Sequence, residues 1–465
     1  MATQDLALIS ATEMVARFKN KSLSPVETTR AALDRIERHN ARFNAYCLVD
    51  AEGALAAAKQ SEARWAKGAP LGPVDGVPTS VKDLVLTKGW PTRRGSKTTT
   101  ADPAPEDAPS VARLREAGAV LLGKTTTPEF GWKGVTDSPL TGITRNPWEE
   151  SRTPGGSSGG ASAAAAAGMG ALHIGTDGGG SIRIPASFAG IFGIKASFGR
   201  VPAWPPSPFA SVSHLGPMTR TVADAALMLS VLTRPDSRDW YALPAETRDW
   251  TAGLEDGISG LRLAFAPTLG QAPVDPEVAT SVAAAARRFE ELGARVEEAA
   301  PPLQDSQGVF AAHWFPAAAV LLDSLPAEKR PLIDPGLRAI AEQGARMSLL
   351  DHLKAVRARE AMGMAMAEFH RRYDLLLLPT MPMPAFEAGQ ETPVDSANRR
   401  WVDWTPFTYP FNLTRQPAAT VPCGLTKAGL PIGLQIVGRL YDDATVLRAA
   451  RAFERLAPFP MPKLG

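Results

Sequence analysis

Apolar and polar positions along the chain alternate between helical periodicity and short β-like runs. In residues 22–40, SLSPVETTRAALDRIERHN, Ser24 can cap a helix, the proline after it suits the first helical position and Glu27 completes a capping box. The segment is therefore predicted to be an amphipathic surface helix. Residues 111–124 and 283–299 each combine a helical stretch, a glycine stop and a short β run. This repeated alternation predicts an α/β layer architecture, built either as one large sheet or as two lobes.

The middle and the C-terminal third of the chain continue this alternation. Residues 157–177 begin with serines and glycines, continue through alanines and end in ALHIGTD, which predicts a tightly packed helix that feeds a short strand. Residues 300–380 are mainly helical in pattern until YDLLLLPT. Its four leucines, bounded by Asp374 and Pro379, predict a strand buried on both faces.

Composition narrows the class of protein. The chain has 465 residues, of which 44% are hydrophobic and 21% charged, as in an ordinary globular protein. Its 50 Lys and Arg nearly balance 48 Asp and Glu, so no charge field favours nucleic acid or a membrane surface. The N-terminus lacks a basic region followed by an apolar core, and no run of about 18 apolar residues occurs. We therefore expect a cytoplasmic protein.

Cysteine and histidine usage bears on metals and on disulfides. Cys47 and Cys423 are the two cysteines, too few for a disulfide framework or a CxxC metal site. The six histidines are scattered without an HxxxH pair. We expect no metal and no cofactor. Cys423, flanked by apolar residues in VPCGL, is interpreted as a small core residue.

Two short motifs fit the sequence patterns of known catalytic or binding sites, but the elements around them do not fit those sites. Residues 118–125, GAVLLGKT, satisfy the phosphate-loop pattern, but the residues between the glycines form an apolar β run rather than a loop that opens a helix. Residues 156–160, GSSGG, fit the nucleophile elbow with Ser158 at the centre, although the preceding segment is turn-like rather than strand-like. A Ser-His-Asp site stays open as an alternative, with four histidines that could supply the base: His214, His313, His352 and His370.

The stretch GTDGGGSIR, residues 175–183, places three glycines directly before Ser181. Each glycine costs about 0.5–1 kcal/mol relative to alanine in regular structure, so the run needs a reason. Without Cβ atoms, successive backbone N–H groups can converge on one point and hold a developing oxyanion, with Ser181 as a nucleophile beside its own donors. A plain turn is the alternative interpretation.

Lys82 is the candidate base. It lies in GVPTSVKDLV, where a glycine-proline turn leads into a short apolar run. Burial there would lower its pKa from about 10.4 and leave a neutral amine near neutral pH. The alternative is a surface lysine paired with Asp83. Ser157 and Ser158 lie in a glycine-flanked turn that opens a helix.

These segments resemble a known family. TPGGSSGGASAAAAAGMGALHIGTDGGGSIRIPASFAGIFGIKASFGRVP (153–202) closely resembles the signature segment of the amidase signature family, and GVPTSVKD (76–83) resembles its lysine motif. The resemblance continues through 123–132, 214–229 and 409–439, and so covers nearly the whole chain. It implies a single α/β domain over residues 1–465, with a twisted mixed β-sheet flanked by helices on both faces, a helical N-terminal region (1–65) and a variable substrate-pocket region at about 300–410.

The resemblance also implies a catalytic triad and its surroundings. Carried over by motif, the nucleophile is Ser181, the bridging serine is Ser157, 24 residues earlier, and the base is Lys82. The Gly156–Ser157 peptide bond is then expected to be cis. The remaining implied site comprises an oxyanion hole from the N–H groups of Gly178, Gly179, Gly180 and Ser181, and supporting roles for Ser158, Asp177 and Arg183.

Two positions depart from the family pattern. Gly178 stands where many members carry a larger residue, which predicts a more mobile loop. Arg415 replaces a commonly seen glycine, which puts that helix or turn in doubt but leaves the triad intact.

Aromatic residues in the variable parts indicate an apolar substrate pocket, and we predict a hydrolase of apolar or aryl amides, monomeric or homodimeric, with carbamates and esters also open as substrates. One alternative is the glutamine-hydrolysing component of a tRNA-dependent amidotransferase, which needs a partner subunit; another is an inactive binding protein. The predicted pocket residues are Phe130, Trp132, Trp204, Trp404 and Phe407.

Overall fold

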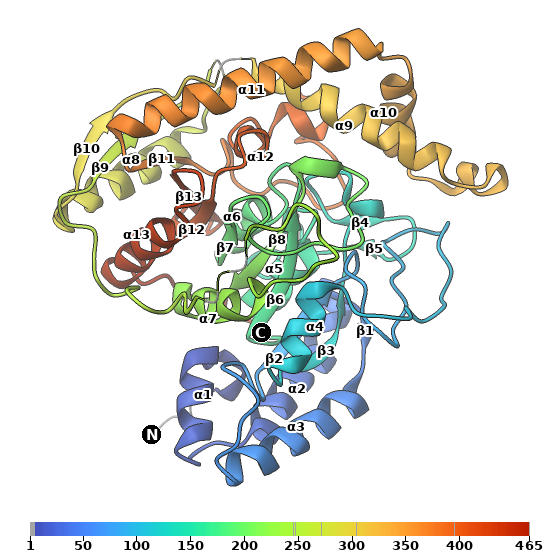
Figure 1. Ribbon diagram of the computed structural model, residues 1–465, viewed down its shortest axis with the longest axis vertical. Helices are drawn as coiled ribbons and strands as arrows, with labels where there is room; N and C mark the ends of the chain where they lie inside the picture. The colour runs from blue at the N-terminus through green and yellow to red at the C-terminus, as the bar shows by residue number, and fades with distance from the viewer. Residues whose placement is uncertain are drawn as a thin grey trace.

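The strands form one large sheet rather than two lobes. The computed structural model describes residues 5–244, 246, 248–270, 272–303, 305–394 and 396–464. Eleven strands pair in the order β1-β3-β2-β6-β8-β7-β12-β13-β11-β9-β10 (Figure 1). They are β1 (Tyr46–Val49), β2 (Pro78–Lys82), β3 (Val120–Thr125), β6 (Leu172–Asp177), β7 (Phe192–Lys195), β8 (His214–Thr219), β9 (Arg262–Phe265), β10 (Arg295–Glu298), β11 (Leu375–Pro379), β12 (Ala418–Leu425) and β13 (Pro431–Gly438). A separate pair joins β4 (Asp137–Ser138) and β5 (Gly142–Ile143).

Helices cover the sheet and extend beyond it. Figure 1 shows α1, α2 and α3 at one end of the molecule, and α9, α10 and α11 at the other. The first long helix begins as the sequence predicts, because Ser24 caps it and Glu27 closes the capping box. The helices are α1 (Ala11–Lys19), α2 (Pro25–Phe43), α3 (Ala51–Ala66), α4 (Pro109–Glu116), α5 (Gly159–Ala166), α6 (Arg183–Ala189), α7 (Val222–Leu232), α8 (Pro276–Glu291), α9 (Ser306–Asp323), α10 (Pro335–Ala345), α11 (Leu349–Arg372), α12 (Pro410–Leu413) and α13 (Asp443–Leu456).

Strand β11 shows that both faces of the sheet are buried. Leu375 and Leu377 belong to a core cluster that includes residues of α7, α8 and α13, whereas Leu376 and Leu378 belong to a second cluster with residues of α9 to α12. Successive side chains of a strand point to opposite faces, so a run of four leucines is what a doubly covered strand requires. The predicted buried strand is confirmed. Within the described ranges, no helix is long and apolar enough to cross a membrane.

The order of three neighbouring strands determines where the functional residues meet. Strand β2 pairs in parallel with both β3 and β6, so Val81 lies opposite Ile174 and the carboxyl ends of β2 and β6 lie at the same edge. Lys82 ends β2 and Asp177 ends β6. Residues 120–125, inside the phosphate-loop match, are strand β3 itself, so they form no loop that opens a helix.

Candidate active site

Lys82 lies inside the protein rather than on its surface. Its side chain is fully buried, and its Nζ lies 2.7 Å from Ser157 Oγ, 2.8 Å from Ser158 Oγ and 2.8 Å from Thr176 Oγ1. Burial lowers the pKa of Lys82 well below its usual value, and the negative charge of Asp177 only partly opposes this. The surface pairing with Asp83 does not occur, since Asp83 pairs with Lys124 at 3.5 Å.

The three hydroxyls around Lys82 can accept three hydrogen bonds from a protonated amine, or accept two and donate one when the amine is neutral. Ser158 Oγ donates its own proton to the carbonyl oxygen of Thr176 (3.1 Å), so towards Lys82 it acts as an acceptor. The Thr176 hydroxyl can accept the second amine proton. Ser157 Oγ accepts from the amine in the protonated form of Lys82, and it faces the lone pair when the amine is neutral.

Ser157 and Ser158 lie in the turn that leads into α5. The Gly156–Ser157 peptide bond is cis, as the resemblance implied. A Cβ at Gly156 would lie 2.8 Å from Val135 Cα, so this turn packs directly on another backbone segment and admits no side chain. The N–H of Ser158 donates to the carbonyl oxygen of Ser181 (3.2 Å). This bond joins the serine turn to the end of the glycine loop.

The glycine loop follows strand β6 and is clamped by Asp177. This carboxylate accepts hydrogen bonds from the N–H groups of Gly180 (2.8 Å) and Ile182 (3.2 Å). The oxyanion hole expected from four consecutive N–H groups therefore needs correction, because the N–H of Gly180 is directed at the Asp177 carboxylate. The N–H groups of Gly178, Gly179 and Ser181 remain as candidate donors, and Ser181 itself is 6% exposed.

The other glycines of the loop give room to aromatic rings. A Cβ at Gly178 would lie 2.8 Å from the ring of Trp314, and one at Gly179 would lie 2.8 Å from the rings of both Phe310 and Trp401. Trp314 thus fills the space that a larger residue at position 178 would take. Arg415, the second departure from the family pattern, adopts the left-handed conformation (φ 65°) that glycine favours.

Arg183 neutralises Asp177 inside the protein. Its guanidinium donates to both Asp177 carboxylate oxygens (2.9 Å each) and also to the side chains of Gln435 (2.7 Å) and Asn412 (2.7 Å). Burial alone would raise the pKa of Asp177, but the charge and hydrogen bonds of Arg183 and the Asn412 amide hold it far below its usual range. Sequence reasoning missed Asn412, Gln435 and Thr176. Asn412 lies within the resembling segment 409–439, which was the available signal.

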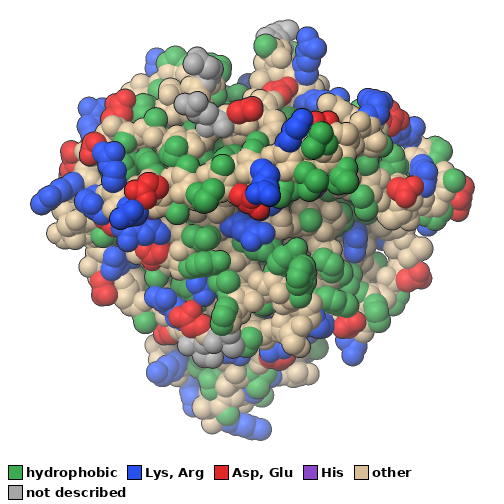
Figure 2. Space-filling view, turned by 45° about the horizontal axis from the view of Figure 1, so that its top comes forward, with side chains coloured by type: hydrophobic (Ala, Val, Ile, Leu, Met, Phe, Trp, Pro, Cys, Tyr) green, Lys and Arg blue, Asp and Glu red, His purple; other side chains and the backbone are tan. Residues whose placement is uncertain are grey.

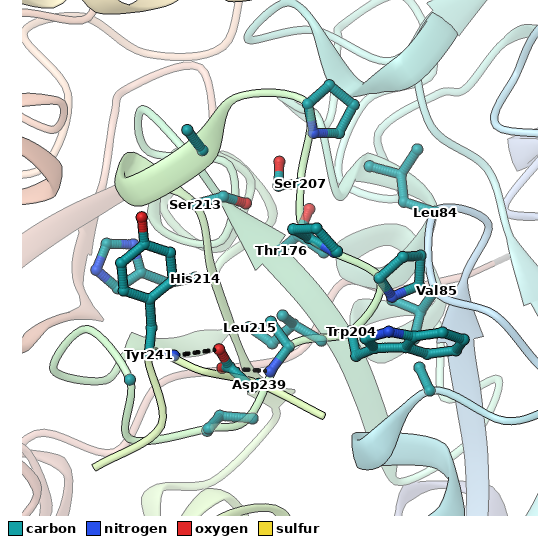
Figure 3. Close-up of a pocket in the computed structure, with 18 of the residues that line it drawn as sticks. Leu84, Val85, Thr176, Trp204, Ser207, Ser213, His214, Leu215, Asp239 and Tyr241 are labelled. Carbon is teal, nitrogen blue, oxygen red and sulfur yellow. Dashed lines mark hydrogen bonds between the residues drawn. The ribbon is translucent and has the colours of Figure 1, made fainter. Parts of the chain in front are cut away.

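A cavity of about 290 Å³ opens beside this cluster. Figure 3 shows Leu84, Val85 and Trp204 on one side of it and His214 and Tyr241 on the other. Thr176, which contacts Lys82 Nζ, also lines the cavity. A Cβ at Gly131 would lie 2.7 Å from Leu84 Cδ1 and 3.2 Å from Ser157 Oγ, so this wall adjoins the serine turn.

The five predicted pocket aromatics separate into two groups. Phe130 and Trp204 line the cavity. Trp132, Trp404 and Phe407 belong instead to the hydrophobic core, with exposed fractions of 0%, 1% and 0%, and they do not line the cavity. Their assignment to the pocket is corrected: the segment that suggested an apolar wall packs inward, against the aromatic residues of α9.

Among the described residues, no histidine is hydrogen-bonded to Ser158 or Cys423, the alternative nucleophiles. Hydrogen bonds connect Ser158 with Lys82 and Thr176, and in the described ranges none connects it with a histidine. Each of the four candidate histidines instead contacts a backbone carbonyl through Nδ1: His214, His313, His352 and His370. Burial raises the pKa of the Cys423 thiol to about 12, and the residue is partly buried against a core cluster rather than inside it. Among the residues with described positions, no three His, Cys, Asp or Glu side chains form a metal-binding group.

A larger groove of about 1180 Å³ lies next to the cavity, between α9, α11 and residues 413–416, and Pro208 and Ala210 line both. None of the residues that contact Lys82 lines it. On the face in Figure 2, hydrophobic side chains are mixed with both basic and acidic ones, without a continuous field of one sign.

Comparison with known proteins agrees with the fold and the motifs. The sequence profile of the Amidase family matches residues 27–447. An acylamidase of Rhodococcus erythropolis is 40% identical over 99% of this chain and 98% of that protein. A glutamyl-tRNA(Gln) amidotransferase component from Myxococcus xanthus (strain DK1622) is 38% identical over 98% of each. The crystal structure of a bacterial aryl acylamidase of the amidase signature family aligns with a TM-score of 0.90, 32% identity and 98% coverage of both chains.

These matches show that the chain is an amidohydrolase with a single α/β domain. It belongs to the amidase family, known also as the amidase signature family, as its motifs indicated. Relatives of similar identity include both an acylamidase and a component of an amidotransferase, so the family alone leaves the substrate open.

Proposed function

We propose that the chain is an acylamidase that hydrolyses apolar or aryl amides through an acyl-enzyme on Ser181. The observation that carries this proposal is the fully buried Lys82 amine, 2.7 Å from Ser157 Oγ, whose pKa burial lowers. A neutral amine in that position can act as a general base near neutral pH, and the second serine can pass the proton on.

In the proposed acylation, Lys82 Nζ takes the proton of Ser157 Oγ while Ser157 Oγ takes the proton of Ser181 Oγ. The Ser181 oxygen forms a bond to the substrate carbonyl carbon, and the negative charge on the carbonyl oxygen is held by N–H groups from Gly178, Gly179 and Ser181. When the intermediate collapses, the C–N bond breaks and Ser157 gives a proton to the departing nitrogen. Ser157 regains its proton from Lys82.

Deacylation uses the same groups with water in place of the amine. The Lys82–Ser157 pair removes a proton from water, the hydroxide oxygen attacks the ester carbon, and the Ser181 oxygen leaves with the returned proton. Asp177 and Arg183 take no part in proton transfer in this scheme. Their buried ion pair fixes the loop from which the candidate oxyanion donors project.

The character of the cavity supports an apolar substrate. Leu84, Val85, Phe130, Trp204 and Leu215 contribute apolar walls. Burial of apolar surface is worth about 25 cal/mol per Å². A cavity on the order of 150 Å³ is enough to hold benzene. The aligned crystal structure is that of an aryl acylamidase, and the R. erythropolis relative is an acylamidase, which agrees with this choice.

A second candidate is glutamine hydrolysis within an amidotransferase, favoured by the 38% identity to the M. xanthus protein. Free glutamine carries an ammonium group that needs an acceptor. Among the described residues that line the cavity, Asp239 is the one carboxylate, and it already accepts hydrogen bonds from the N–H groups of Ala203 and Tyr241 (2.8 Å each). An unpaired buried charge is penalised strongly, so we rank this candidate second.

One experiment tests the function and separates the candidates. Purified protein is assayed with acetanilide, 4-nitroacetanilide and glutamine, and is then labelled with a fluorophosphonate and digested for mass spectrometry. We expect kcat/KM for an anilide to exceed that for glutamine by at least about 10²-fold, a difference of roughly 2.7 kcal/mol in transition-state binding. The label should lie on Ser181 and be absent from Ser181→Ala. Equal turnover of glutamine would favour the amidotransferase function, and a label on Ser158 or Cys423 would overturn the proposed nucleophile.

A further inference from the structure

An arginine side chain lines the cavity beside Lys82, Ser157 and Ser158 and takes no part in the proposed mechanism. Arg94 lines the cavity together with Leu84, Phe130 and Trp204, and its side chain is half-buried. No hydrogen bond or ion pair joins its guanidinium to another residue in the described part of the chain. Burial lowers the pKa of Arg94 and the nearby charge of Asp83 opposes this, but an arginine remains protonated at any physiological pH.

The other charged groups of the cavity are already paired. Arg238 donates to both carboxylate oxygens of Asp236 (2.9 and 2.8 Å) and to Glu106 (3.0 Å). Asp239 accepts the backbone N–H groups of Ala203 and Tyr241. Asp83, whose carbonyl oxygen accepts the backbone N–H of Arg94, pairs through its carboxylate with Lys124 rather than with Arg94. Among the described residues that line the cavity, Arg94 is therefore the one cation whose side chain has neither a hydrogen-bond partner nor an ion-pair partner.

The backbone at Arg94 is fixed to both halves of the candidate catalytic cluster. Its N–H donates to the carbonyl oxygen of Asp83 (3.1 Å), the residue after Lys82, and its carbonyl oxygen accepts from the N–H of Phe130 (2.8 Å). Phe130 precedes Gly131, which lies against Ser157. Arg94 adopts a left-handed backbone conformation (φ 54°), which is uncommon for a residue with a side chain. Such strained conformations persist where the surrounding structure holds them, and they cluster at functional sites.

We propose that Arg94 is a specificity-determining residue that binds a carboxylate carried by the substrate, so that the preferred amides combine an apolar or aryl body with one anionic group. This proposal rests on the proposed acylamidase function. A guanidinium offers two parallel N–H donors in the geometry of a carboxylate, and the apolar walls around it strengthen the interaction by excluding water. A cavity of about 290 Å³ has room for one aryl ring and its substituent.

The test uses two pairs of anilides that differ in a carboxylate. In the first pair, 4-acetamidobenzoate and acetanilide, the charge is on the amine side; in the second, N-phenylsuccinamate and N-phenylbutanamide, it is on the acyl side. We expect Arg94→Leu to lower kcat/KM at least about tenfold for the carboxylate-bearing member of one pair, and less than about threefold for its uncharged partner. Arg94→Lys, which keeps the charge, should retain part of the preference.

Arg238→Gln is the matched control, because Arg238 lines the same cavity but is already paired. It should change the ratio within each pair by less than about threefold. A ratio that stays constant in Arg94→Leu for both pairs would overturn the proposal, even where uncharged anilides are hydrolysed well. Failure of the wild type to hydrolyse any anilide would instead count against the proposed function.

A measurement on the wild type covers the case in which the Arg94 variants do not fold. Benzoate and nitrobenzene have nearly the same shape but differ in charge. We expect benzoate to inhibit acetanilide hydrolysis competitively with an inhibition constant at least about tenfold lower than that of nitrobenzene. Equal inhibition constants would contradict a carboxylate subsite.

Discussion

The pH dependence of the free energy of unfolding, compared between the wild type and Lys82→Met, shows whether Lys82 is neutral or charged in the folded protein. Lys82 is fully buried, its three polar partners are hydroxyls, and burial lowers its pKa. In the unfolded chain the same lysine has a pKa of about 10.4. Between its folded and unfolded pKa values, the unfolded state therefore holds one more proton than the folded state.

The size of the effect follows from linkage alone. One extra proton in the unfolded state makes the free energy of unfolding rise with pH by about 1.4 kcal/mol per pH unit. Lys82→Met removes this contribution. Between about pH 8 and 9.5, below the unfolded pKa, the wild-type slope should exceed that of the variant by close to this value. The assay is equilibrium urea unfolding at four or five pH values.

Lys133→Met provides the control, because Lys133 is also buried but is ion-paired with Asp137 (2.6 Å) and Asp334 (3.3 Å). Burial lowers the pKa of Lys133, yet the two carboxylates raise it on balance. It is charged in both states throughout the same pH range, so its removal should leave the slope unchanged although it lowers stability.

Equal slopes for wild type and Lys82→Met would show that Lys82 is protonated in the folded state, and the proposed base would be refuted. If the lysine is neutral, kcat/KM of the wild type should fall as the pH is lowered through the folded pKa of Lys82. Lys82→Met should lose about 10²–10⁴-fold in kcat/KM, the contribution expected of general base catalysis.

Two further substitutions test the loop. Gly180→Ala should lower kcat/KM by at least about 10²-fold, because Gly180 has φ +129° and a new Cβ would lie 2.6 Å from Thr408 Cβ; steady-state kinetics measure this, and near-normal activity would mean that the loop relaxes easily. Asp177→Asn should lower the free energy of unfolding by about 3–5 kcal/mol, because it leaves the Arg183 charge buried without a counter-charge; urea unfolding measures this, and a loss under about 1 kcal/mol would contradict it.

The features that sequence predicted well are those with local causes. The start of α2 follows from the Ser24–Glu27 capping box, which involves four consecutive residues. Strand β11 follows from four leucines, because only a strand covered on both faces uses such a run. The cis bond at Ser157 came from the resemblance, whose motifs cover nearly the whole chain.

The features that sequence could not supply depend on partners far away in the chain. The Gly180 N–H looked free because its acceptor, the Asp177 carboxylate, is oriented by Arg183 and by Asn412, 235 residues beyond Asp177. The aromatic residues of 401–411 suit a core and a pocket equally well, and composition could not separate Trp404 from Trp204. Arg94 carried no motif at all, and only its place in the cavity and its lack of a partner in the described residues distinguish it from other arginines.

The packing around position 178 links the candidate oxyanion donors to helix α9. Trp314, on α9, fills the space beside Gly178, and it stacks on Phe209 with ring centroids 3.7 Å apart. Phe209 lies between two residues that line the cavity, Pro208 and Ala210. Interiors are close-packed, so a larger residue at 178 requires a smaller one at 314, or a displaced α9. The absence of a side chain at Gly178 therefore matches the bulk of Trp314. No described residue of 300–410, the range expected to form the substrate pocket, lines the cavity. Substitutions in this range must nevertheless preserve the donors at 178 and 179, because aromatic rings from it contact both glycines.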